Sequence, residues 1–316
     1  MEKKLSGLII RAQSGFLTVR TQDGDYICRL RGRLKKGEVK GDIAAVGDHV
    51  RIAAYEDGSG TIDAIEPRQH LLSRQLSGIK WKYQQILLAN PDQVIFVFAC
   101  AEPDPHLRML DRFLVVAEKQ AIPPIIVANK VDLVGLNNAQ KIFGLYEELG
   151  YPLIYTSALT KRGVDELHKK LIGKISAFAG PSGVGKSSLL NAVQPELGLA
   201  VRSVSESTSK GLHTTQVREL FQLDSGGYVA DMPGLRTVAL WDTEPEELDA
   251  YFREMRELVS ECQFSDCTHR SEPGCAVREA VRTGQVNAER YESYLHLRFG
   301  GEYDERTFAS NIDKLP

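Results

Sequence analysis

The chain has 316 residues, of which 42% are hydrophobic and 26% charged, and its formal net charge at pH 7 is −3. These values are typical of a globular protein with two or three domains, and they exclude binding to nucleic acid or anionic membranes through overall charge alone. No apolar run approaches the ~18 residues of a membrane helix, the first residues lack the apolar core of a signal peptide, and the five cysteines do not suggest a disulfide framework. We therefore expect a cytoplasmic protein without a membrane partner.

Residues 1–68 are predicted to form a small β-barrel domain. Short apolar runs with strand character are separated by segments of hairpin-turn composition at 22–25 and 56–60. Five strands in so short a segment favour a closed barrel of the oligonucleotide-binding (OB) type, which would make this an RNA-binding domain. The predicted strands are 7–10, 16–20, 26–30, 47–52 and 60–65.

The stretch 29–40 gives this domain a local positive charge, with six basic residues against the acidic Glu38. On charge alone a solvated loop is the default interpretation, whereas on an OB barrel such a stretch predicts contact with an RNA backbone. Aromatic residues for base stacking are few here (Phe16, Tyr26 and Tyr55). We therefore expect recognition of shape and phosphate rather than of base sequence.

Residues 69–240 alternate apolar strand runs with helical patterns, which predicts a mostly parallel α/β sheet covered by helices. The motifs in this region each follow the carboxyl end of a predicted strand, where open parallel sheets bind ligands. The predicted strands are 94–99, 125–128, 153–156, 174–179 and 228–230, and the predicted helices are 106–119, 139–149, 164–171 and 187–192.

The sequence at 129–132, Asn-Lys-Val-Asp, matches the N-K-x-D signature with which GTPases recognise guanine. The Asp132 carboxylate would accept hydrogen bonds from the ring N–H and the amino group of guanine, a donor pair that adenine lacks. Asn129 would link this loop to the phosphate loop, and the stem of Lys130 would lie against the base.

Thr156-Ser157-Ala158, after the next strand, is predicted to be a second base-contacting element. Ser157 and Ala158 would contact the nucleotide, with the backbone N–H of Ala158 facing the guanine oxygen. A lone N-K-x-D match is weak evidence, but the two elements together favour GTP. They argue against an ATP-dependent kinase that shares only the phosphate loop.

The run 180–187 fits the phosphate-loop pattern G-x-x-x-x-G-K-[ST], with a predicted strand before it and a helix after it. Glycines let backbone N–H groups surround the phosphates, and the helix N-terminus adds the positive end of its dipole. We expect Lys186 to reach the outer phosphates of bound GTP or GDP, and Ser187 to coordinate Mg²⁺. The predicted nucleotide contacts of this loop are Gly180, Ser182, Gly183, Val184, Gly185, Lys186, Ser187 and Ser188.

Two segments after the phosphate loop are predicted to sense the γ-phosphate. The sequence at 231–234 matches D-x-P-G, so that Asp231 would hold the Mg²⁺ shell and the Gly234 N–H would contact the phosphate. The segment 194–215 is long and has little periodicity, and we expect it to be the first switch. Thr214 or Thr215 would be its magnesium ligand, with Thr215 taken as the assignment.

The predicted catalytic residues are Lys186, Thr215 and His213. Leu235 occupies the position where many GTPases carry a glutamine that orients the attacking water, and its side chain cannot hydrogen-bond. Intrinsic hydrolysis should therefore be slow unless another group positions the water. His213 is the nearest polar candidate, and an exposed switch residue without a catalytic role is the alternative.

The order of the motifs is inverted, because the guanine motif at 129–132 precedes the phosphate loop at 180–187. In an ordinary GTPase it follows that loop, so the order predicts a circularly permuted GTPase domain. The same order places both switch segments directly before the C-terminal region. It predicts that the state of the γ-phosphate is coupled to the pose of that region.

Residues 241–316 are predicted to form a helical domain, with helices at 251–260 and 287–299. Four N/S ligands at high density predict one closed, structural Zn²⁺ site, since a catalytic site keeps an open position. The alternative is a set of buried free cysteines with an incidental histidine. The four predicted ligands are Cys262, Cys267, His269 and Cys275.

These three parts together resemble the ribosome small-subunit-dependent GTPase A (RsgA) family over essentially the whole chain. The resemblance implies a GTP hydrolase that binds the 30S ribosomal subunit and its rRNA late in maturation and is released after hydrolysis, which the subunit stimulates. It also implies a role for His213 in hydrolysis, and Met232 departs from the threonine common in the family. The resemblance depends on the motifs at 129–132, 156–158, 180–187, 211–215 and 231–234, and on the cysteine–histidine cluster.

A second interpretation is an RNA-binding assembly scaffold in which GTP is a placement signal with negligible turnover. Leu235 gives this interpretation some support, because it removes the usual water-orienting group. In either case we expect a monomer.

Overall fold

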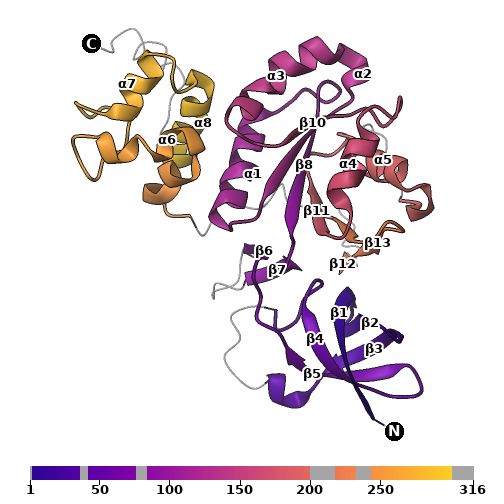
Figure 1. Ribbon diagram of the computed structural model, residues 1–316. Helices are drawn as coiled ribbons and strands as arrows, with labels where there is room; N and C mark the ends of the chain where they lie inside the picture. The colour runs from indigo at the N-terminus through magenta and orange to yellow at the C-terminus, as the bar shows by residue number, and fades with distance from the viewer. Residues whose placement is uncertain (1, 36–41, 76–83, 200–217, 233–242, 301–316) are drawn as a thin grey trace.

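The computed structural model describes residues 2–35, 42–75, 84–199, 218–232 and 243–300 of the chain. In Figure 1 an N-terminal barrel, a central α/β part and a group of C-terminal helices follow one another along the chain. None of the helices in these residues combines the length and the apolar character needed to cross a lipid bilayer.

The N-terminal strands close into a barrel, which confirms the predicted OB-type fold. They are β1 (Lys3–Gln13), β2 (Phe16–Thr21), β3 (Gly24–Leu30), β4 (His49–Ala54) and β5 (Ser59–Ile65), and a 3₁₀ helix, η1 (Gly32–Lys35), follows β3. Neighbouring strands pair in the order β1-β2-β3-β5-β4, and β4 pairs with β1 to close the ring. Successive strand residues face opposite sides, and Ile9, Val19 and Ile52 fill the interior.

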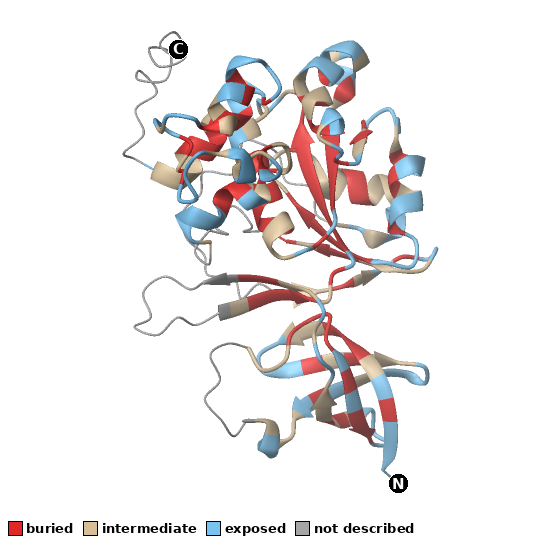
Figure 2. Ribbon diagram, turned by 60° about the vertical axis from the view of Figure 1, so that its left-hand side comes forward, coloured by how far each residue is buried: buried red, intermediate tan, exposed pale blue. Residues whose placement is uncertain are grey.

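An antiparallel hairpin of β6 (Leu71–Gln75) and β7 (Gln84–Ala89), which the sequence did not predict, lies between the barrel and the central sheet (Figures 1 and 2). Ala89 N donates to Val46 O at 2.9 Å, so the hairpin is attached to the barrel. Leu88 is buried in a hydrophobic cluster that runs from the barrel interior to one face of the central sheet. The barrel and the sheet therefore share one continuous core.

In the described part of the chain, six strands form the central sheet, which confirms the predicted α/β domain. The strands are β8 (Gln93–Ala99), β9 (Pro124–Asn129), β10 (Leu153–Tyr155), β11 (Ile175–Ala179), β13 (Phe221–Gln222) and β14 (Tyr228–Asp231). Their order is β10-β9-β8-β11-β14-β13, and only the edge pair β13–β14 is antiparallel. A further short strand, β12 (Arg218–Glu219), pairs instead with β1 of the barrel.

Helices cover both faces of this sheet. They are α1 (Leu107–Lys119), α2 (Val131–Val134), α3 (Leu136–Glu148), α4 (Val164–Leu171), α5 (Lys186–Val193) and the 3₁₀ helix η2 (Pro195–Leu197). Phe113 of α1 and Phe143 of α3 belong to the core cluster on one face. Leu167 of α4 and Leu189 of α5 belong to the cluster on the other.

The C-terminal part consists of short helices around its own core. They are η5 (Pro245–Tyr251), α6 (Arg253–Arg256), η6 (Val259–Glu261), α7 (Ala276–Arg282) and α8 (Ala288–Phe299). The prediction of one helix at 251–260 is wrong, because Phe252 adopts extended backbone angles that place its ring in the core and interrupt the helix. The predicted helix at 287–299 is confirmed as α8, and its Asn287 side chain accepts hydrogen bonds from Glu289 N and Arg290 N.

The C-terminal helices pack on α1 of the central domain. Val115 of α1 is fully buried in their hydrophobic cluster. Arg290 of α8 is 1% exposed and pairs with Asp111 of α1 at 2.6 Å and with Glu254 of α6 at 2.7 Å. Tyr146 of α3 donates to the same Asp111 carboxylate at 2.7 Å. A buried, fully paired arginine thus connects the two domains.

Candidate nucleotide site and metal centre

The predicted nucleotide motifs meet at one edge of the central sheet. The guanine motif begins at the last residue of β9, the phosphate loop joins β11 to α5, and Asp231 is the last residue of β14. Parallel neighbouring strands bring these carboxyl ends together, although the segments are far apart in sequence.

The phosphate loop has the backbone shape that its glycines permit. Gly183 and Gly185 have positive φ angles of 79° and 93°, which residues with a Cβ rarely adopt. A Cβ on Gly180 would lie 2.1 Å from Val97 O of the neighbouring strand. The Lys186 ammonium donates to Gly180 O and Pro181 O at 3.0 Å each, so its charge lies against the loop at the start of α5.

Asn129 is fully buried and links the guanine loop to the phosphate loop. Its Nδ2 donates to Val184 O at 2.8 Å, and its Oδ1 accepts from the Thr156 hydroxyl at 3.0 Å. The second bond determines which end of the Asn129 amide faces the phosphate loop. Three loops from three strands are therefore held in a fixed arrangement.

The two other signature residues of the guanine motif, Lys130 and Asp132, are half-buried and exposed, respectively. Lys130 has a left-handed backbone, with φ of 62°, and its ammonium donates to Glu102 O in the β8–α1 loop. Asp132 is exposed in the first turn of α2, which leaves its carboxylate accessible.

The 156–158 element adjoins the guanine loop. Thr156 O accepts from Val131 N at 3.1 Å, which connects the two elements through their backbones. Ser157 is buried, and its hydroxyl accepts from Thr160 N at 3.1 Å. Ala158 is half-buried beside it.

Asp231 is half-buried at the carboxyl end of β14, and its Oδ1 atom is fully buried. Its Oδ1 has no hydrogen-bond partner among the described residues. Burial raises the pKa of this carboxyl group, and the nearby charge of Lys186 opposes that shift. An unpaired buried carboxylate oxygen fits a divalent cation, and half-buried Ser187 in the first turn of α5 offers a hydroxyl oxygen.

Several predicted site residues lie outside the described part of the chain. His213, Thr214 and Thr215 fall within 200–217, and Gly234 and Leu235 fall within 233–242. Their predicted roles therefore come from the sequence alone.

We expect Gly185→Ala to weaken GTP binding by at least ~10-fold. The new Cβ would lie 2.6 Å from Asn129 Nδ2, on a backbone with φ of 93°, and would disturb the Asn129–Val184 hydrogen bond. Gly173→Ala is the matched control, because Gly173 has φ of 70° and a Cβ there would meet nothing within 4 Å. Equal GTP affinity of the two variants in a titration calorimeter would contradict the expectation.

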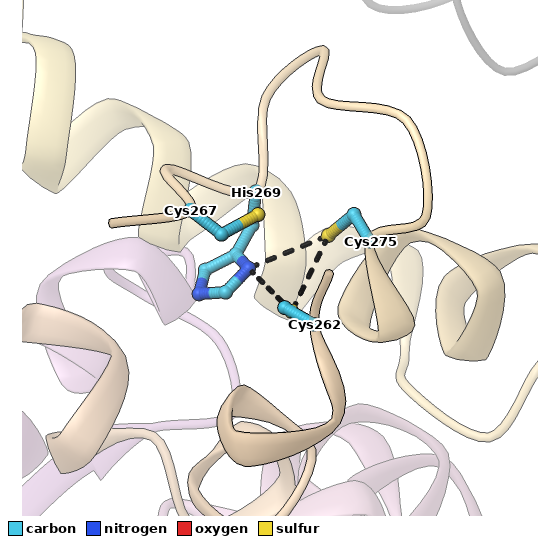
Figure 3. A group of neighbouring side chains, drawn as sticks. All are labelled: Cys262, Cys267, His269 and Cys275. Atoms are coloured by element: carbon cyan, nitrogen blue, oxygen red, sulfur yellow. Dashed lines mark hydrogen bonds between the residues drawn. The ribbon is translucent and has the colours of Figure 1, made fainter. Parts of the chain in front are cut away.

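The four predicted zinc ligands converge in the C-terminal domain (Figure 3). Their donor atoms all lie within 4.8 Å of one another. His269 Nδ1 is 3.4 Å from Cys275 Sγ and 3.5 Å from Cys262 Sγ, and all but Cys262 are buried. Three thiols and one imidazole nitrogen at these distances fit a tetrahedral zinc ion.

Asp249 orients the histidine of this cluster, a role that the sequence did not reveal. Its Oδ2 lies 3.1 Å from His269 Nε2, which favours a proton on that nitrogen and leaves Nδ1 free for a metal. Asp249 is twenty residues from His269 and in no recognisable motif, so only the fold brings them together.

Glu272 shapes the loop between the ligands. Burial by itself would raise the pKa of Glu272, but hydrogen bonds from the Thr268 hydroxyl and from backbone N–H groups lower it to about 2. The carboxylate accepts from Thr268 N at 2.9 Å and from Arg270 N and Ser271 N at 3.0 Å. A single charged acceptor therefore holds the backbone on both sides of His269.

Two family models match most of the chain. The RsgA GTPase model matches residues 65–241, and the RsgA N-terminal domain model matches residues 6–62. A protein of Gemmatimonas aurantiaca named small ribosomal subunit biogenesis GTPase RsgA is 45% identical over 302 residues, covering 94% of this chain and 98% of its own length. A protein of Moorella thermoacetica with the same name is 42% identical and covers 96% of this chain and 100% of its own length.

Solved structures agree with these sequence relatives. The crystal structure of YjeQ from Thermotoga maritima is similar with a TM-score of 0.77 and 37% identity, over 94% of this chain and 98% of that one. YloQ, described as a circularly permuted GTPase, is similar with a TM-score of 0.72 and 31% identity, over 99% of this chain and 97% of that one. The chain belongs to the RsgA GTPase family.

Proposed function

We propose that this GTPase acts in the biogenesis of the small ribosomal subunit, as the names of its relatives indicate for them. It binds the 30S subunit and its rRNA late in maturation, hydrolyses GTP to GDP and phosphate, and is then released. The observation that carries the proposal is the Asn129–Val184 hydrogen bond, which joins the guanine and phosphate loops in a domain with an attached OB barrel. The relatives' names favour hydrolysis over the scaffold alternative.

In the proposed guanine pocket, Asp132 accepts hydrogen bonds from the ring N–H and amino group, and the Lys130 stem lies against the base. Ser157 and Ala158 complete the pocket, with the Ala158 N–H toward the guanine oxygen. Asn129 holds this pocket at a fixed distance from the phosphates, because its amide bonds Val184 O in the phosphate loop.

In the proposed phosphate site, backbone N–H groups of 182–188 and of Gly180 surround the phosphates, and Lys186 pairs with the outer ones. Ser187, Asp231 and Thr215 would hold Mg²⁺, which neutralises charge on the β- and γ-phosphates when bound. Gly234 would contact the γ-phosphate through its N–H. Because Leu235 cannot orient the attacking water, we expect slow hydrolysis without the subunit. His213 is the group proposed to position that water in the stimulated reaction.

One structural Zn²⁺ is proposed to be held by Cys262, Cys267, His269 and Cys275. The donor set and the Asp249–His269 contact support it. We further propose domain boundaries at 1–68, 69–240 and 241–316, a monomeric state and a cytoplasmic location.

The barrel is proposed to contact rRNA through the basic residues at the end of β3 and directly after it. Arg31 Nε pairs with Asp63 Oδ1 at 2.8 Å, and Arg33 Nη2 donates to Asp63 O at 2.9 Å, so both are held at one end of β5. Arg29 lies over the half-exposed ring of Phe16, at 4.4 Å from its centroid. Cations held in place in this way can meet phosphates with a smaller loss of side-chain entropy.

We expect the double variant Arg31→Glu/Arg33→Glu to weaken 30S binding by at least ~10-fold and to reduce its salt dependence, since each lost phosphate contact lowers the salt slope by ~1. GTP affinity should not change, because the patch is remote from the nucleotide motifs. Cosedimentation with 30S subunits, with 50S subunits for comparison, measures this. Lys3→Glu/Lys4→Glu is the control, since both lysines are exposed on β1 of the same barrel. If the two variants bind 30S subunits equally well, the basic residues are a solvated loop and do not contact rRNA.

A further inference from the structure

Residues 218–222, which we call the bridging segment, pair with the barrel at one end and with the central sheet at the other. Its first part, β12, pairs with β1 of the barrel through Arg11↔Glu219 and Ala12↔Arg218. Its second part, β13, pairs with β14 of the central sheet through Phe221↔Val229 and Gln222↔Tyr228. Between them, Leu220 N donates to Ile10 O of the barrel at 2.8 Å.

Consecutive side chains of the bridging segment enter different cores. Leu220 is 3% exposed and belongs to the cluster shared by the barrel and one face of the central sheet. Phe221 packs against the cluster on the other face of that sheet. The side chains of successive strand residues point in opposite directions, and each residue advances the chain by only ~3.3 Å. The five residues of the bridging segment therefore cannot move far while both pairings are kept. A shift of the barrel must therefore move β13 or break these contacts.

Side chains reinforce both ends of the bridging segment. Arg218 Nη1 donates to Ile86 O of the hairpin at 2.6 Å and lies 3.3 Å from Asp42 Oδ2. Arg20 of β2 makes two hydrogen bonds with Asp25 of β3, at 2.8 and 2.7 Å, and donates to Gln222 Oε1. The barrel thus contacts the edge of the nucleotide-binding sheet through a defined set of polar bonds.

Strand β14, which pairs with β13, carries Asp231, the carboxylate proposed to bind magnesium. Tyr228, opposite Gln222, begins β14, and Asp231 ends it three residues later. A displacement of the bridging segment thus reaches Asp231 over a few residues of β14.

We propose that the bridging segment positions Asp231 in response to the barrel, so that an RNA surface bound to the barrel changes the turnover of GTP through β13 and β14. This inference rests on the proposed function, because it assigns a route to the stimulation by the 30S subunit. Arg218 and Gln222 are its positioning residues: they act through the backbone of the segment and do not touch the nucleotide.

Steady-state GTP hydrolysis by the full chain, with and without saturating 30S subunits, tests this route in Gln222→Ala and Arg218→Ala. We expect the KM for GTP and the unstimulated kcat to remain within about twofold of wild type, because the nucleotide contacts are intact. The kcat in the presence of 30S subunits should fall at least ~5-fold, which is the lower end of the effects that coupling between two sites typically has. Arg218→Lys, which can still donate to Ile86 O, should recover part of it.

Arg282→Ala is the matched control, because Arg282 is exposed and pairs only with Glu279 of its own helix among the described residues. If 30S subunits stimulate the wild-type chain and stimulate both variants to the same extent, the proposed route through the bridging segment is wrong, while the proposed function stands. A wild-type chain that 30S subunits do not stimulate would overturn both the proposed function and the route.

Discussion

Asp132→Asn should lower the affinity for GTP by at least ~100-fold and create affinity for xanthosine triphosphate. Asparagine replaces an acceptor oxygen by a donor, which opposes the guanine amino group and leaves hydrogen bonds unmade, while xanthine offers a carbonyl oxygen at that position. Asp132 is exposed in the first turn of α2, so the change should not disturb folding. Equilibrium binding of both nucleotides measures the exchange.

The control for this variant is Asp165→Asn, which also removes an exposed carboxylate, from the first turn of α4. Any general effect of losing a negative charge at a helix N-terminus appears in both variants. If the two bind GTP equally well, Asp132 does not read guanine and the assignment of the base pocket is wrong.

Cys275→Ser should abolish stoichiometric zinc and unfold the C-terminal helices. Structural zinc sites contribute ~10–16 kcal/mol of binding free energy in small zinc-dependent folds, and the core of this domain is small. Cys275 also caps α7 by accepting from Arg278 N at 3.4 Å. Serine keeps a capping acceptor, so the variant isolates the loss of the metal ligand.

Metal analysis by mass spectrometry and thermal unfolding followed by circular dichroism measure this effect. Cys28→Ser is the control, since Cys28 is fully buried in the barrel and remote from the cluster. It should keep one zinc per chain despite its own destabilisation. Wild-type protein without stoichiometric zinc, or unchanged zinc in Cys275→Ser, would show that the cluster is a set of buried thiols.

The sequence was most informative where local chemistry and periodicity act together. The phosphate loop was predictable because Gly183 and Gly185 need positive φ angles and Lys186 begins a helix, and both properties are local. The barrel strands were predictable from alternation and turn residues. The structure extends four of them at their ends and shifts the strand predicted at 47–52 by two residues, to His49–Ala54.

Other features depend on long-range contacts that no local pattern records. The strands β12 and β13 are two residues each, too short for any periodicity, yet they connect the two sheets. The partner of His269 is Asp249, and Phe252 interrupts a helix because its ring lies in the core. The motif order led us to expect coupling toward the C-terminal region, whereas the described contacts of residues 218–222 lead to the barrel.

This difference changes the expected route of regulation. The buried Arg290 network holds the C-terminal helices on α1. The bridging segment, in contrast, is bonded to the strand that carries Asp231. Among the described residues, the contacts that reach β14 from another domain come from the barrel through β13.

The central claim is that this chain couples a guanine-specific site to the small ribosomal subunit. The most direct test is the rate of GTP hydrolysis by the full chain as purified 30S subunits are added. We predict a saturable increase in kcat of at least ~10-fold with 30S subunits and none with 50S subunits, because Leu235 leaves the unassisted chain without the usual water-orienting side chain. Turnover that stays the same at every 30S concentration would contradict the account.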